Sequence, residues 1–205
     1  NEAALKISRL TGRKKIVAFV NSFHGRTMGA LSMTGQSSKR DPFKPLIPHI
    51  SFLPYGDERA LKRGISKRTA MVIIEPIQGE AGVIEASFEF LTALRKKCNE
   101  TGTLLIFDEV QCGFGRTGHF FAFEKHGIIP DIITIAKGMG GGMPIGAFIS
   151  SKQIMSCLTE KPILGHISTF GGHPVCCASA LATIEVIENE KLLKDVNSKA
   201  ELFKS

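Results

Sequence analysis

The chain has 205 residues, 43% of them apolar and 22% charged, with a formal net charge of +7. These values predict one globular domain with a sizeable core. They do not favour a membrane protein, because no apolar run approaches the ~20 residues that a spanning helix needs. The first residues also lack the basic start and apolar centre of a secretory signal.

Cysteine usage and the position of the basic residues narrow the class further. The five cysteines form no C-x-x-C pair, which argues against a disulfide framework and against a zinc site, so we predict no metal and a cytoplasmic protein. We interpret the excess positive charge as solvated surface. Nucleic-acid binding is disfavoured because one tyrosine and no tryptophan are present to stack bases.

The predicted elements alternate between strands and helices. The first third is predicted to contain a helix over 2–11 ended by Gly12, a strand over 16–20, a long functional loop over 21–48 and a strand over 50–53. A helix over 57–67 capped by Asp57, a strand over 71–75, a helix from Ser87 to Glu100, a strand over 104–107 and a helix near 119–126 follow. The last third is predicted to contain strands over 132–136 and 147–149 and helices near 152–159, 174–189 and 190–203.

This alternation predicts an α/β fold with a mainly parallel sheet. Several strands are apolar throughout, as expected where helices cover both sheet faces, so we expect a three-layer α/β/α arrangement. Ligands of such sheets gather at the carboxyl ends of the strands. Glu75, Asp108 and Lys137 each follow a predicted strand, and we expect the three to converge at one edge.

Lys137 and Asp108 are the residue types that a pyridoxal phosphate enzyme needs at this edge. Lys137 follows Ile-Ile-Thr-Ile-Ala and precedes Gly-Met-Gly-Gly-Gly. A partly desolvated lysine has a lowered pKa, and its neutral amine can attack an aldehyde to form a Schiff base. Asp108 can pair with the pyridinium nitrogen. The two are therefore predicted to be catalytic, with pyridoxal 5'-phosphate as cofactor.

Two other interpretations of the same region are weaker. Asp108 with Glu109 resembles the magnesium-binding strand end of nucleotide hydrolases, but no G-x-x-x-x-G-K-[ST] loop accompanies it. Residues 113–118 match G-x-G-x-x-G, a dinucleotide-binding pattern. Two acids stand between the strand and this match, where phosphates would have to lie, so the match is weak evidence.

Further candidate residues lie in loops that follow other strands. Phe23 can cover a planar ring, His24 can hydrogen-bond, and Arg26 can bind a carboxylate with two hydrogen bonds. The alternative for this segment is a turn with exposed side chains. In residues 74–80, Glu75 can orient its neighbours, and Glu80 can pair with an arginine or a substrate cation.

Five segments together resemble a known family. Residues 23–27 (FHGRT), 75–80 (EPIQGE), 107–111 (FDEVQ), 136–138 (AKG) and 168–172 (STFGG) occur in the order seen in class III aminotransferases. The chain is most similar to the acetylornithine, ornithine and 4-aminobutyrate aminotransferase branch. The resemblance covers essentially all 205 residues.

The resemblance implies a fold type I enzyme and a homodimer with active sites at the subunit interface. It implies that Lys137 holds the cofactor as an internal aldimine and that Asp108 binds the pyridine nitrogen. Val110 and Phe23 would pack on the two ring faces, and Gln111 would reach the phenolic oxygen.

It also assigns roles outside the ring. Thr169 would reach the phosphate of the neighbouring subunit's cofactor, and His24 and Glu75 would complete the cofactor site. Glu80 resembles a switch glutamate that pairs with a distal arginine when the amino donor is bound. Arg26 matches a position that meets a substrate carboxylate.

Family members are longer than this chain. We therefore expect residues 1–205 to be the central part of the large, cofactor-binding domain, without the N-terminal segment and the C-terminal small domain, and to be inactive alone. The expected reaction moves an amino group from an ω-amino donor, such as acetylornithine, ornithine or 4-aminobutyrate, to 2-oxoglutarate. A non-catalytic dimerising module, or a class III aminomutase or decarboxylase, remain alternatives. Neither a nucleic acid nor a membrane is expected as a partner.

Overall fold

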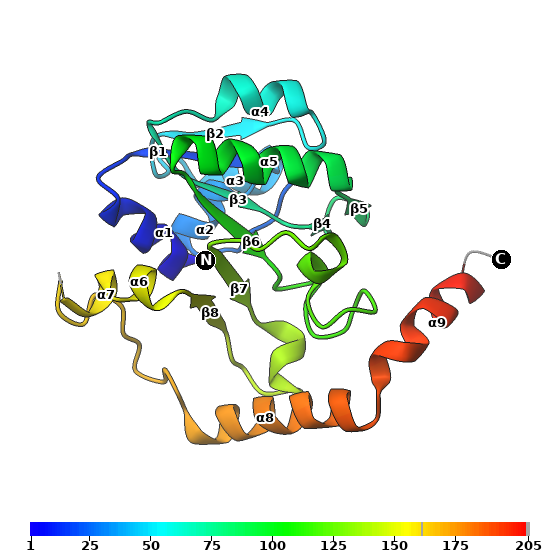
Figure 1. Ribbon diagram of the computed structural model, residues 1–205. Helices are drawn as coiled ribbons and strands as arrows, with labels where there is room; N and C mark the ends of the chain where they lie inside the picture. Colours follow the sequence, from blue (N-terminus) through cyan, green and yellow to red (C-terminus); the bar gives the residue numbers. More distant parts are fainter. Residues whose placement is uncertain (161, 204–205) are drawn as a thin grey trace.

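The computed structural model describes residues 1–160 and 162–203 and places a central sheet between helices (Figure 1). Strand order in the sheet is β2-β1-β3-β6-β7-β8. All neighbouring pairs are parallel except β7 with β8, which confirms the predicted mainly parallel α/β sheet. The strands are β1 (Lys15–Phe19), β2 (Ile50–Leu53), β3 (Thr69–Ile74), β6 (Leu104–Asp108), β7 (Ile132–Ile135) and β8 (Ala147–Ser150).

One face of the sheet is covered by α4 (Glu58–Gly64) and α5 (Phe88–Thr101). Phe19 and Phe107 from the strands pack there with Phe90 and Leu94 of α5. Each fully buried large side chain of this kind contributes about 1.5–3 kcal/mol relative to an exposed one. This cluster fixes β1 and β6, and with them the loops that leave their carboxyl ends.

The opposite face is covered by α1 (Glu2–Leu10), whose Leu5 and Ile7 pack against Ile16 of β1 and Ile106 of β6. Successive side chains of a strand point to opposite faces, so Ile16 belongs to this cluster while its neighbour Val17 belongs to the other. Both faces are therefore apolar, which explains why the central strands are apolar throughout.

The predicted caps are confirmed. The carboxylate of Asp57 accepts hydrogen bonds from the Arg59 and Ala60 amides at 2.8 and 3.1 Å. Ser87 accepts one from the Phe90 amide at 3.1 Å, and Gly102 ends α5 at a φ of 63°. Helix α4 ends at Gly64 rather than near residue 67, because Ile65 turns into the core in an extended conformation.

The prediction of an unbroken loop over 21–48 was wrong in part. The segment contains α2 (Met28–Met33), α3 (Ser37–Arg40) and the short 3-10 helix η1 (Asp41–Phe43). Helix α2 forms because Leu31 and Met33 are buried, and it lies against α1. Its six residues are too few to show a helical period in the sequence.

Other differences concern short elements. A hairpin of β4 (Ile77–Gln78) and β5 (Ile84–Glu85) was not predicted, and the helix expected near 119–126 is the 3-10 helix η2 (Ala122–His126). The helix expected at 152–159 is divided into α6 (Lys152–Met155) and α7 (Cys157–Glu160). The last expected helix is divided into η4 (Leu192–Asp195) and α9 (Val196–Leu202).

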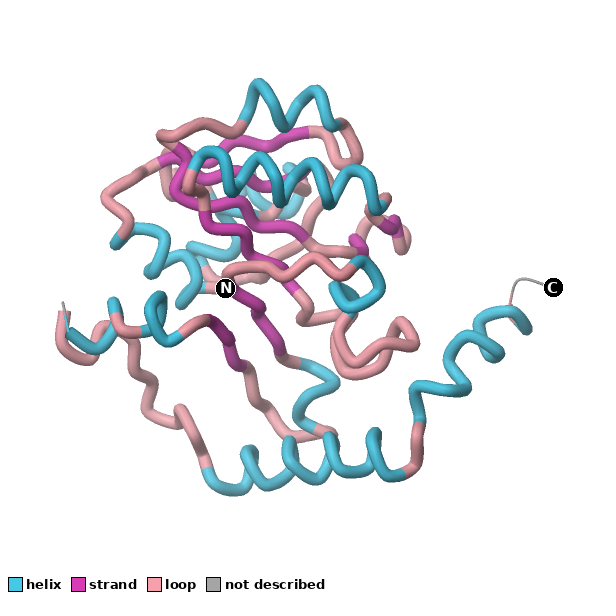
Figure 2. Tube along the Cα trace, in the orientation of Figure 1, coloured by secondary structure: helices cyan, strands magenta, loops and turns pink. Residues whose placement is uncertain are grey.

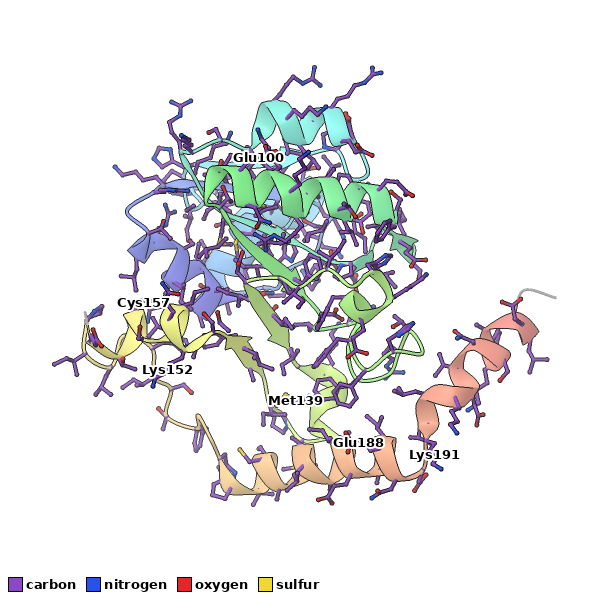
Figure 3. All side chains as sticks on the ribbon, viewed as in Figure 1. Glu100, Met139, Lys152, Cys157, Glu188 and Lys191 are labelled. Atoms are coloured by element: carbon purple, nitrogen blue, oxygen red, sulfur yellow. The ribbon has the colours of Figure 1, made fainter. Side chains whose placement is uncertain are left out.

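Helices α8 (Pro174–Asn189) and α9 run along one side of the molecule, and α9 projects from it (Figures 1 and 2). Helix α8 packs against the 3-10 helix η3 (Lys137–Gly140), where Ser179 donates to the Gly140 carbonyl at 2.7 Å. Met139 of η3 is labelled between the sheet and α8 in Figure 3. Among the described residues, no helix is long and apolar enough to cross a membrane.

Candidate active site

The carboxyl ends of β3, β6 and β7 bring the three predicted strand-end residues to one edge of the sheet. Ile74 pairs in register with Phe107, and Asp108 pairs with Thr134. Glu75 and Asp108 come directly after the paired residues Ile74 and Phe107, so they leave neighbouring strands at the same level. The 3-10 helix η3 begins with Lys137 just beyond β7. Lys137 has a φ of 46°, a left-handed conformation that is uncommon outside glycine and is found at functional sites.

Asp108 is buried and accepts hydrogen bonds from three donors. Its Oδ2 atom lies 2.8 Å from His24 Nδ1 and 2.8 Å from Asn1 Nδ2, and its Oδ1 atom lies 3.1 Å from the Val110 amide. Thr134 donates to Asn1 Oδ1 at 2.8 Å, which orients the Asn1 amide group toward Asp108. These donors fix the orientation of the Asp108 carboxylate.

His24 is buried next to Asp108. Its Nδ1 atom must carry a proton to donate to the carboxylate. Its Nε2 atom is buried and has no hydrogen-bond partner among the described residues. The predicted hydrogen-bonding side chain in this loop is therefore present, and its partner is Asp108.

Glu75 holds the loop that carries Phe23. Its Oε2 atom accepts a hydrogen bond from the Phe23 amide at 2.9 Å. Burial raises the pKa of Glu75 to about 7, and the nearby His24 and the Phe23 amide limit the rise. Tyr55 donates to the Glu75 and Pro76 carbonyls, each at 2.9 Å, so the backbone of this strand end is fixed as well.

Lys137 lies next to Gln111, with its Nζ atom 2.9 Å from Gln111 Oε1. A side chain at Gly79 would place its Cβ 2.5 Å from Gln111 Nε2, so glycine there leaves room for this amide. The sequence predicts a partly desolvated lysine, but Lys137 is exposed in the described chain. It points to Gln111 at the open edge of the sheet instead of into the core.

Of the two predicted substrate-binding residues, Arg26 lies near Phe23 and Glu80 pairs with Lys39. The Arg26 guanidinium lies 5.5 Å from the centroid of the Phe23 ring. Glu80 is partly exposed and forms an ion pair of 3.0 Å with Lys39. Thr169 is exposed on the loop before α8, and no hydrogen bond within the described residues joins it to the cluster.

Glu109 is a residue that the sequence did not single out for a structural role. It is fully buried and accepts hydrogen bonds from the Ala122 and Phe123 amides at 3.0 and 2.9 Å, and from Cys112 Sγ at 3.2 Å. Burial raises its pKa. It ties the loop over 111–121 back to the end of β6. The only feature of the sequence that pointed to Glu109 was its position next to Asp108.

The G-x-G-x-x-G match lies within this loop, in turns rather than at the start of a helix. Phe114 inside the match packs against Phe120 and Phe121. The amides of the segment are therefore not presented as a helix N-terminus, which the dinucleotide interpretation requires.

A cavity of about 360 Å³ adjoins the cluster, with His24, Arg26, Val110 and Ala136 among its lining residues. A larger hollow of about 700 Å³ lies at the amino ends of β1 and β2 and is lined by basic residues such as Lys14 and Arg68. We place the candidate site at the smaller cavity, because three predicted site residues, His24, Arg26 and Val110, are among its lining residues.

The comparison with protein families decides the assignment. The Aminotransferase class-III family model matches residues 1–205. The chain belongs to the class III aminotransferase family. Its membership confirms the predicted resemblance and accounts for the order of the five motifs.

Relatives and solved structures agree with this assignment. The chain is 48% identical over 205 residues to an acetylornithine aminotransferase of Streptomyces coelicolor, covering 100% of this chain and 50% of that protein. It is 47% identical to a [LysW]-aminoadipate semialdehyde/glutamate semialdehyde transaminase of Sulfolobus acidocaldarius, covering 98% of this chain and 51% of that protein.

The fold is also that of solved aminotransferases. An ornithine aminotransferase of Toxoplasma gondii, whose crystal structure shows pyridoxal phosphate at partial occupancy, superposes with a TM-score of 0.87 at 32% identity, over 94% of this chain and 47% of that one. The chain thus spans about half the length of the relatives that it matches.

Proposed function

We propose that the protein containing this chain transfers an amino group from an ω-amino donor to 2-oxoglutarate, with pyridoxal 5'-phosphate bound through Lys137. Donors of the acetylornithine or ornithine type fit the names of relatives that are acetylornithine and ornithine aminotransferases. A donor of the 4-aminobutyrate type is included because of the motif resemblance. The observation that carries the proposal is the convergence of Lys137 with Gln111 and of Asp108 with His24 at the carboxyl edge of one sheet.

The residues present fit the cofactor by their chemistry. Asp108 is a buried carboxylate that accepts three hydrogen bonds, which hold it in one orientation for a protonated ring nitrogen. Lys137 offers a primary amine, and Gln111 an amide next to it. When bound, pyridoxal phosphate supplies an aldehyde that condenses with amines and a ring that accepts charge from the substrate carbon.

The chain's own residues bind, orient and move protons in this proposal. Asp108 would keep the ring nitrogen protonated, and Phe23 and Val110 would cover the ring faces. Lys137 would hold the cofactor and, once released by the substrate amine, carry a proton to and from the substrate carbon. Its position beside Gln111 leaves the Lys137 amino group at the exposed edge of the sheet, where we expect substrate to enter.

Substrate binding falls to charged groups at the rim. Arg26 offers a guanidinium that can hold a carboxylate with two hydrogen bonds. Glu80 offers a partly exposed carboxylate that can change partners. We propose Thr169 as a contact to the cofactor phosphate in a neighbouring subunit, a role that its exposure in this chain permits.

We further propose that this chain is the central part of the large domain of a homodimer. Exposed apolar side chains on the loop before α8 and on α8 itself support a subunit interface there: Ile163, Leu164, Ile167, Phe170, Val175 and Leu181. All five cysteines are unpaired, which suits a reducing compartment such as the cytoplasm.

The proposal is tested by a panel of donors with the full-length protein, pyridoxal phosphate and 2-oxoglutarate. We expect glutamate to form with at least one ω-amino donor. A different class III activity predicts that the substrate is rearranged or loses carbon dioxide without glutamate formation. A non-catalytic dimerising module predicts no turnover of any donor, and either outcome would refute amino transfer.

A further inference from the structure

Lys39 makes two contacts with residues of the candidate site, although it was not itself predicted as a site residue. Its Nζ atom lies 3.0 Å from Glu80 Oε2 and 4.9 Å from the centroid of the Phe23 ring. The side chain is about one-quarter exposed, and that of Glu80 is 42% exposed. A single lysine thus joins the predicted substrate-binding carboxylate to the predicted stacking ring.

The first contact determines the charge that Glu80 presents to a ligand. The hydrogen bond and the charge of Lys39 lower the pKa of Glu80, and the charges of Lys137 and Arg26 act in the same direction. Glu80 is therefore ionised and already has a counter-ion. A cationic group of a substrate or of the protein must compete with Lys39 for this carboxylate.

The pair is also able to open. Ion pairs between partly exposed side chains contribute little net stability, because water solvates both charges well. When Glu80 takes another partner, Lys39 loses its counter-ion but remains beside the Phe23 ring, which attracts a cation through its π-face. Arg26 lies near the same ring. Lys39 and Arg26 then both lie near the Phe23 ring without a carboxylate partner from Glu80.

We propose that Lys39 is a specificity-determining residue, which serves as the counter-ion of Glu80 and, when Glu80 is engaged elsewhere, receives a carboxylate of the substrate. The inference rests on the proposed function, because it assumes that substrate binds at Phe23 and Glu80. The favoured ligands are dicarboxylic acids, in which Arg26 can hold one carboxylate and Lys39 the other. Monocarboxylates gain less from Lys39.

The binding test uses unreactive ligands and the cofactor-loaded full-length protein. Glutarate carries two carboxylates and butyrate carries one, and calorimetry gives the Kd of each. Lys39→Met keeps the length of the side chain but removes its charge. We expect it to raise the Kd of glutarate about two- to five-fold, with a smaller effect on butyrate, and Lys39→Arg to restore glutarate binding.

Two further variants separate this role from a structural one. Glu80→Gln removes the competing carboxylate, so we expect glutarate to bind more tightly, the opposite sign to Lys39→Met. Lys44→Met is the matched control, because Lys44 is 64% exposed and pairs with Asp41 instead. Three results would each overturn the proposal. They are unchanged glutarate binding in Lys39→Met, an equal change in Lys44→Met, and weaker glutarate binding in Glu80→Gln.

A measurement without cofactor or substrate isolates the ion pair itself. In the cofactor-free protein, NMR titration of the ¹³C-labelled Glu80 carboxyl should show a higher pKa in Lys39→Met than in wild type, and no rise in Lys44→Met. An unchanged Glu80 pKa would overturn the inference even if transamination is found. Absence of transamination with a raised Glu80 pKa would instead refute the proposed function and leave the pair established.

Discussion

His24 Nδ1 and Asp108 Oδ2 lie 2.8 Å apart, and both side chains are buried at the carboxyl edge of the sheet. One residue comes from the loop after β1 and the other from the end of β6, so the contact joins two segments 84 residues apart. It orients the carboxylate that the proposed chemistry depends on. The loop after β1 is thereby tied to the same site.

Replacement of His24 should weaken the cofactor site. His24→Phe keeps a ring but removes the donor, which leaves the Asp108 carboxylate with one hydrogen bond fewer. A lost hydrogen bond to a buried charged group costs about 1.5–3 kcal/mol, so we expect cofactor affinity to fall roughly ten- to a hundred-fold. Equilibrium titration with pyridoxal phosphate measures this. An unchanged affinity would contradict the role of His24.

Glu75 should make the stability of the protein fall as pH rises. Its pKa is raised from 4.5 to about 7 in the folded protein, so between these values the folded state binds more protons than the unfolded state. The contribution of Glu75 is therefore fully present below about pH 4.5 and is lost as pH approaches 7. The loss is on the order of 2–3 kcal/mol.

Glu75→Gln provides the comparison, because glutamine does not titrate but can still accept the Phe23 amide hydrogen bond. The free energy of unfolding of wild type minus that of the variant should decrease from pH 4.5 to 7 in urea denaturation. Glu109, whose pKa burial also raises, is common to both proteins and cancels. A difference that stays constant or increases with pH would show that Glu75 is not buried as described.

Glu109 should be required for an ordered loop over 111–121. Glu109→Ala leaves two backbone amides, the buried one of Ala122 and the partly buried one of Phe123, without their acceptor. We expect a loss of about 2–5 kcal/mol in unfolding free energy and faster hydrogen exchange of these amides. Glu100→Ala on the exposed side of α5 is the control and should change stability by less than about 0.5 kcal/mol. Equal effects of the two variants would disprove the anchoring role.

Gly35 should not tolerate a side chain. A Cβ atom there would lie 2.0 Å from the Phe19 carbonyl oxygen and 2.9 Å from the Asn21 and Ser22 amides, all of which are backbone atoms that cannot rotate away. Overpacking of this kind costs about 1–3 kcal/mol, and the shift would displace the loop that carries Phe23. Gly146→Ala, whose Cβ would meet its nearest neighbours at 3.5 and 3.7 Å, should be nearly neutral. Thermal unfolding of both variants tests this contrast.

Much of the fold could be predicted because its signals are local. Apolar runs before Glu75, Asp108 and Lys137 mark buried strands, and Asp57 and Ser87 mark helix starts through their own side chains. The convergence of the three strand-end residues then follows from parallel pairing alone. The short helix α2 was missed because tertiary burial of Leu31 and Met33, rather than a repeating pattern, stabilises it.

The contacts within the site are less predictable. Motif order assigns Phe23 and Glu80 by resemblance, but nothing in the sequence indicates that Lys39 lies between them. Such a contact depends on how the segment over 21–48 folds back over the sheet. The exposure of Lys137 is likewise not set by the apolar run that precedes it. It depends on how the side chain turns toward Gln111 beyond the end of β7.

The central claim, that Lys137 binds pyridoxal phosphate, is tested most directly by the visible absorbance of the full-length protein after addition of the cofactor and removal of its excess. We predict a band that marks the cofactor bound to a lysine amine and that disappears on borohydride reduction, with the label then found on Lys137 by peptide mass spectrometry. Lys137→Ala should show neither the band nor the label. A band that persists in Lys137→Ala, or a label on another lysine, would contradict the account.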